Sequence, residues 1–73
     1  MAHERITADP AILMGKPVIK GTRISVKQIL RELGHGLTPE AIVHEHPHLS
    51  LEDVRAAQAF AADHLSDEEV VFR

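Results

Sequence analysis

The chain of 73 residues contains no cysteine, and its only aromatic residues are two phenylalanines. Without cysteine it can form neither a disulfide nor a zinc site with thiolate ligands, and the absence fits a reducing compartment. Proteins that bind single-stranded nucleic acid by base stacking need several aromatic side chains, so this class is disfavoured. The sequence therefore predicts a small domain with an aliphatic core.

Long apolar runs are also missing. No run approaches the roughly 20 residues of a membrane span, and residues 1–10 lack the basic and then apolar order of a signal peptide. We therefore expect a cytoplasmic protein without a membrane partner.

The usual signatures of an enzyme are absent as well. The chain has no Gly-x-Ser-x-Gly sequence and is too short for a substrate cleft. The run from Gly15 to Thr22 lacks the Gly-Lys-Ser/Thr ending of a phosphate-binding loop. These absences predict a protein that is not an enzyme and needs no cofactor.

A chain of this length forms a single domain. Its residues are 44% hydrophobic and 26% charged, as in globular proteins. Domains below roughly 70–80 residues usually need a disulfide, a metal or a partner chain in addition to their core. Since disulfides are excluded, we expect a homodimer or docking on another protein.

Extended structure is predicted for the first two dozen residues, a β-segment over 5–24. Ile6 to Ala8 is a strand that ends at Asp9-Pro10, because the residue before a proline is kept out of the helical region. Two β-branched runs, 18–19 and 22–24, flank Lys20-Gly21. An X-Gly pair between such runs predicts a tight hairpin with Gly21 at positive φ.

Three helices are predicted at about 25–34, 38–46 and 50–65, each from the same start signal. A Ser or Thr caps the first turn, with one apolar residue before the cap and another at the fourth helical position. The three caps are Ser25, Thr38 and Ser50. Glycines at 34 and 36 end the first helix, and Pro47 ends the second.

The predicted fold class is mainly α, with a short N-terminal β-hairpin followed by a three-helix bundle. The short link between the second and third helices favours a helix-turn-helix-like arrangement. This domain occupies residues 1–65, and an acidic C-terminal tail occupies residues 66–73.

Charge is divided unevenly between the halves of the chain. Residues 1–36 hold six basic and three acidic side chains, whereas residues 37–73 hold two basic and eight acidic ones. Such asymmetry indicates an anionic partner for the first half, or merely solvated surfaces of different sign. If DNA is bound, we expect basic residues of the hairpin and first helix to contact its phosphates: Lys16, Lys20, Arg23, Lys27 and Arg31.

The third helix would enter the DNA groove in the usual helix-turn-helix docking mode. It begins with Glu52 and Asp53, however, and carboxylates at this place repel phosphates. We therefore expect these two residues to be structural.

Residues 66–73 combine acidic side chains with an apolar end. Val70, Val71 and Phe72 form that end, and Arg73 follows. A segment of this kind can become ordered on a partner protein. Alternatively it is a frayed terminus with Val70 and Phe72 packed on the chain's own core.

His44, His46 and His48 alternate along the end of the second helix. Alternate residues share a face only on a strand, and Pro47 interrupts the helix here. We predict solvated imidazoles and no metal site.

Several stretches resemble the domain of unknown function 433 family. They are ITADP at residues 6–10, GKPVIKGTRISV at 15–26, LTPE at 37–40 and PHLSLEDV at 47–54. The resemblance covers residues 6 to about 64 and implies a fold similar to helix-turn-helix DNA-binding domains.

The same resemblance implies a function, since members of this family are often VapB-like antitoxins paired with PIN-like nuclease toxins. We therefore expect a homodimeric antitoxin of a type II toxin–antitoxin pair. Its toxin-binding residues would be Val70, Val71, Phe72 and Arg73, and operator DNA would be a second partner. The alternative is a stand-alone DNA-binding or protein-interaction domain with no toxin partner. The dimer face is left open between the hairpin edge and the Ala-rich stripe of the third helix.

Overall fold

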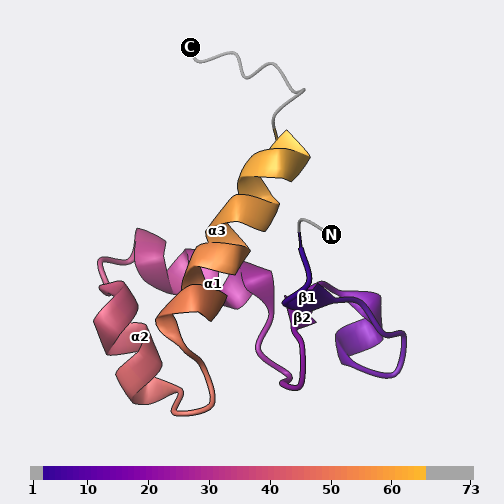
Figure 1. The fold of residues 1–73 in the computed structure, drawn as a ribbon, viewed down its shortest axis with the longest axis horizontal. Coiled ribbons are helices and arrows are strands. Elements are labelled where there is room, and N and C mark those ends of the chain that lie inside the picture. Colours follow the sequence, from indigo (N-terminus) through magenta and orange to yellow (C-terminus); the bar gives the residue numbers. More distant parts are fainter. Residues whose placement is uncertain (1–2, 66–73) are drawn as a thin grey trace.

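Residues 3–65 are described by a computed structural model, and residues 1–2 and 66–73 lie outside the described part. The elements in chain order are β1 (Ile6–Thr7), the 3-10 turn η1 (Leu13–Gly15), β2 (Val18–Ile19), α1 (Val26–Gly34), α2 (Pro39–Glu45) and α3 (Leu51–Leu65). The expected fold class is confirmed. Figure 1 shows α2 at one end of the molecule and the two strands at the other, with α1 between them and α3 crossing α1.

The two strands form a small antiparallel sheet in which Ile6 lies opposite Ile19. Gly21 has a φ of 83°, and the amide of Thr22 donates to the carbonyl of Ile19 at 3.0 Å, so the predicted tight turn is confirmed. The segment after this turn adds only a single bridge, at Ser25, rather than a third strand. The regular partner of β2 is therefore β1, a pairing that the local sequence pattern does not specify.

Side-chain caps set the helix starts, as the sequence predicts. The hydroxyl of Ser25 accepts from the amide of Gln28 at 2.9 Å, and that of Thr38 accepts from the amide of Ala41 at 3.1 Å. Each cap satisfies a backbone donor that would otherwise lack a partner, and this stabilises the helix by about 1 kcal/mol. None of the helices within residues 3–65 has the length and apolar character needed to cross a membrane.

The core is small and aliphatic. It lies where α3 packs against α1, α2 and β1. Its largest fully buried side chains come from four different elements: Val18, Ile19, Ile29, Ile42 and Val54. Leu65, by contrast, is 58% exposed. Figure 1 shows the reason: the second half of α3 extends beyond the other elements.

Candidate functional site

An apolar groove of about 420 Å³ lies between the start of α1 and the second half of α3. Its apolar walls are formed by Pro17, Val26, Leu30, Phe60, Ala61 and Leu65. Lys16 and Lys27 also line it and add positive charge. The groove reaches Leu65, the residue from which 66–73 continue the chain. It is therefore an apolar surface flanked by cations.

The N-terminal segment braces the α3 wall of this groove. The ring of His3 packs edge-on against Phe60 at a centroid distance of 5.2 Å, and its Nε2 lies 2.8 Å from a carboxylate oxygen of Asp63. The ring of His64 also packs against Phe60, at a centroid distance of 4.0 Å, and its Nδ1 donates to the Phe60 carbonyl. These contacts fix the orientation of Phe60, which lines the groove.

The five basic residues expected to contact DNA do not form a single surface depression. Lys16, Lys27 and Arg31 together line one polar depression on α1 and the loop before it. Lys20 lines a different depression, where Arg5 and two carboxylates are its neighbours, and Arg23 is exposed just after the turn. All five side chains are exposed, but the structure brings only three of them together.

The acidic start of α3 is engaged within the fold. The amide of Ser50 donates to the Asp53 carboxylate at 3.0 Å, and the amide of Asp53 donates to the Ser50 hydroxyl at 3.2 Å, which forms a reciprocal capping box. Arg5 donates to the other oxygen of Asp53 at 3.0 Å. Since Asp53 is only 7% exposed, it is a structural residue. The role of Arg5 has no local sequence signal, because its partner lies 48 residues away.

The residues expected to bind a toxin are Val70, Val71, Phe72 and Arg73. They lie outside the described residues, so this expectation depends on their sequence alone.

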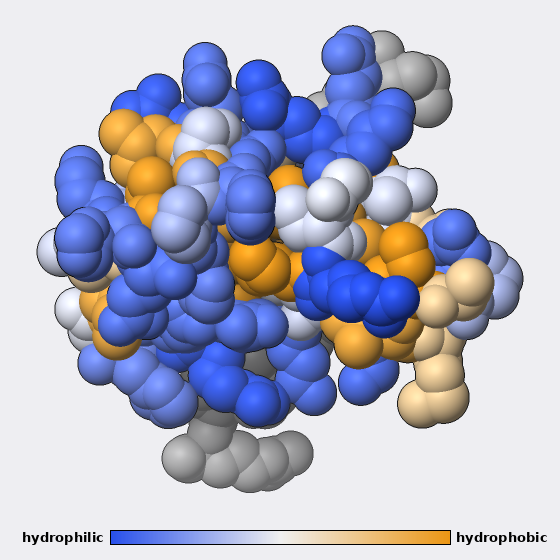
Figure 2. Space-filling model, turned by 90° about the horizontal axis from the view of Figure 1, so that it is seen from below, coloured by the Kyte–Doolittle hydropathy of each residue, from blue (hydrophilic) through white to orange (hydrophobic). Residues whose placement is uncertain are grey.

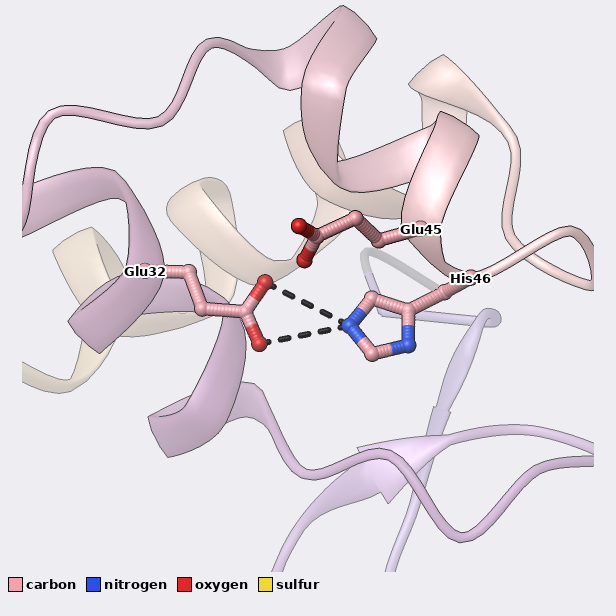
Figure 3. Close-up of side chains that lie close together, drawn as sticks. All are labelled: Glu32, Glu45 and His46. Atoms are coloured by element: carbon pink, nitrogen blue, oxygen red, sulfur yellow. Dashed lines mark hydrogen bonds and ion pairs between the residues drawn. The ribbon is translucent and has the colours of Figure 1, made fainter.

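His46 lies against α1, and for this residue the prediction of a solvated imidazole is wrong. Its Nε2 is 3.3 and 3.2 Å from the two carboxylate oxygens of Glu32, and both side chains are only about one-fifth exposed, at 22% and 21%. The backbone leaves the helix at His46 (φ −122°, ψ 83°), which turns the side chain away from the outer face of α2. Glu45 lies beside this pair in Figure 3. His44 and His48 are exposed, as predicted.

A second apolar surface lies near the strands. In Figure 2 the lower face of the molecule is mostly hydrophilic, with hydrophobic side chains visible on the side of the strands and again on the opposite side. Leu13 and Met14 in η1 are 41% and 89% exposed. Both have positive φ, 49° and 57°, a conformation that side-chain-bearing residues rarely adopt. This strained, exposed turn has no signature in the sequence, which shows only a short apolar run.

Comparison with known proteins places the chain in a family. Residues 6–61 match the model of the family described as "Protein of unknown function (DUF433)". An uncharacterized protein of Sinorhizobium fredii, y4eO, is 35% identical over 60 residues, which are 82% of this chain and 27% of that protein. The chain thus spans about a quarter of the length of this relative. No solved structure matches the chain. The family match runs from β1 into the second half of α3 and includes the turn, the three caps and the core, so the chain belongs to the DUF433 family.

Proposed function

We propose that the protein is the antitoxin of a type II toxin–antitoxin pair and neutralises a PIN-like nuclease toxin. The observation that carries this proposal is the apolar groove between α1 and α3. Stable protein interfaces have an apolar centre surrounded by polar and charged groups. The groove offers this combination, because Leu30 and Phe60 are accessible in it beside Lys16 and Lys27.

Residues 66–73 extend the proposed toxin-binding surface. They combine acidic side chains with Val70, Val71 and Phe72, and such segments bind by becoming ordered on a partner. Arg73 then supplies a guanidinium that pairs with carboxylates of a nuclease site, where a metal ion would otherwise be bound.

The test is co-expression with the product of the neighbouring reading frame, followed by pull-down and a growth assay for neutralisation. Deletion of residues 66–73 and the substitution Ala61→Glu should each abolish neutralisation, since the second places a charge in the apolar groove. Gln58→Glu is the matched control, because it adds the same charge at an exposed position of α3 that does not line the groove.

All variants should keep the helical circular-dichroism signal of the wild type. If neutralisation survives both the deletion and Ala61→Glu, neither surface is the toxin contact. If the neighbouring frame encodes no small Asp-rich nuclease-like protein, the alternative of a stand-alone binding domain is favoured.

Autorepression by DNA binding is a second proposed function. It is supported by the gathering of Lys16, Lys27 and Arg31 around one depression, a surface that a homodimer would double. In a gel shift on the protein's own promoter, Lys27→Gln and Arg31→Gln should weaken binding and reduce its dependence on salt. Arg55→Gln is the control, because Arg55 is an exposed cation of α3 that does not line this depression. Binding that does not weaken with salt would contradict contacts to phosphates.

A further inference from the structure

Three potential metal ligands come together where the end of α2 meets α1. Glu32 lies in the second half of α1, Glu45 is the last residue of α2, and His46 follows it. One ligand atom from each, two carboxylate oxygens and an imidazole nitrogen, lie within 4.8 Å of one another. Figure 3 shows the three side chains converging on one point from the two helices.

The electrostatics of this cluster favour a cation. Glu32 has hydrogen-bond partners, because the Nε2 of His46 and the side-chain amide of Gln28 both contact its carboxylate. Within residues 3–65, by contrast, no hydrogen bond or ion pair engages the side chain of Glu45, although its carboxylate lies beside that of Glu32. Glu45 also lies at the C-terminal end of α2, where the helix dipole already places negative partial charge. An anion at that place is destabilising unless a positive charge offsets it.

The distances and the ligand types indicate which cation fits. In a tetrahedral site with bonds of about 2.1 Å, ligand atoms are about 3.4 Å apart. The 3.2 Å between Nε2 of His46 and Oε2 of Glu32 already meets this requirement. Glu45 is exposed, so its side chain is free to rotate and close the remaining gap. An imidazole among the ligands favours a first-row transition metal over calcium or magnesium, which prefer oxygen ligands alone.

We propose that Glu32, Glu45 and His46 form a binding site for a divalent transition-metal ion, which fastens the end of α2 to α1. The ion binds the lone pair on Nε2 of His46 while the ring proton lies on Nδ1, and water completes its coordination. Such a site supplements a small core that has no disulfide to support it. It also explains why a carboxylate stands at the end of α2 next to a second carboxylate.

The test is isothermal titration of the chain with zinc chloride, together with thermal unfolding in the presence and absence of zinc. Wild-type protein should bind one zinc ion per chain, and its melting temperature should rise with zinc. Glu45→Gln should weaken binding at least tenfold, while His44→Gln, the control for exposed histidines, should bind as the wild type does.

Glu45→Gln should fold, because the side chain is exposed and makes no hydrogen bond within the described residues. Without zinc its melting temperature should equal or exceed that of the wild type, since the variant removes the carboxylate repulsion. With zinc it should fall below that of the wild type. Absence of saturable one-site binding, or equal losses in Glu45→Gln and His44→Gln, would overturn the site and indicate an adventitious ion only.

Discussion

Asp53 joins the beginning of α3 to the N-terminal segment. Its carboxylate accepts from the amide of Ser50 and from the guanidinium of Arg5, while its own amide is bound by the Ser50 hydroxyl. Asp53→Ala removes the first two bonds at once. We expect a loss of about 2–3 kcal/mol in the free energy of unfolding, from a cap of about 1 kcal/mol and a hydrogen bond to a charged group of about 1.5 kcal/mol or more.

Urea denaturation followed by circular dichroism measures this loss. Glu52→Ala is the matched control, because the Glu52 side chain is 70% exposed and lies 3.9 Å from Arg5. Exposed ion pairs of this kind stabilise proteins by less than about 1 kcal/mol. Equal losses in the two variants would show that the capping box and the Arg5 contact do not support α3.

Backbone strain at Met14 predicts a substitution that raises the free energy of unfolding instead of lowering it. The residue has a φ of 57° and is 89% exposed, so it is held in the left-handed region without compensating burial. Met14→Gly should raise the free energy of unfolding by about 0.5–1 kcal/mol, since glycine adopts positive φ without the clash of a Cβ atom. Met14→Ala removes the same side chain but keeps the Cβ, so it should leave stability nearly unchanged. An equal gain in both variants would trace the effect to the side chain rather than to the backbone.

At the level of the elements, the end of α1 contains two glycines for which replacement by alanine should have opposite effects on stability. Gly34 is the last helical residue, and a Cβ there would meet open space. Gly36 follows with a φ of 98°, and its amide donates to the carbonyl of Leu33. Gly34→Ala should therefore stabilise the protein by about 0.5–1 kcal/mol, whereas Gly36→Ala should destabilise it by about 1 kcal/mol or more. Thermal unfolding of the two variants in parallel checks the signs, and like signs would contradict this account of the helix end.

The helix starts and the turn were predictable because their causes are local. Ser25 and Thr38 bond to amides three residues ahead, and Gly21 is needed within its own turn. The contacts between distant segments were not predictable. The partner of β2 and the bond between Arg5 and Asp53 depend on packing of the whole chain, and so does the approach of His46 to Glu32. The alternating histidines predicted solvated rings, because a local pattern cannot show that His46 packs against α1.

On the scale of the whole molecule, the small core favours self-association. Only eight hydrophobic residues of the described part are buried, and no disulfide supports them. We therefore expect a homodimer whose melting temperature rises with protein concentration, because unfolding of a dimer is coupled to dissociation. Light scattering should give twice the mass of the chain.

The exposed alanines of α3 provide a test of the dimer face. Ala59 and Ala62 are exposed, and helical spacing places them on the side of α3 away from Ala57, which is fully buried. If two α3 helices pack through these small residues, Ala62→Glu should halve the mass and remove the concentration dependence of the melting temperature. His44→Glu, with the same charge at an exposed position of α2, should preserve both. If Ala62→Glu remains dimeric, the hairpin edge is the remaining candidate face, because β1 has a strand neighbour only on the β2 side. A melting temperature that stays constant over about a hundredfold range of concentration would contradict the dimer itself.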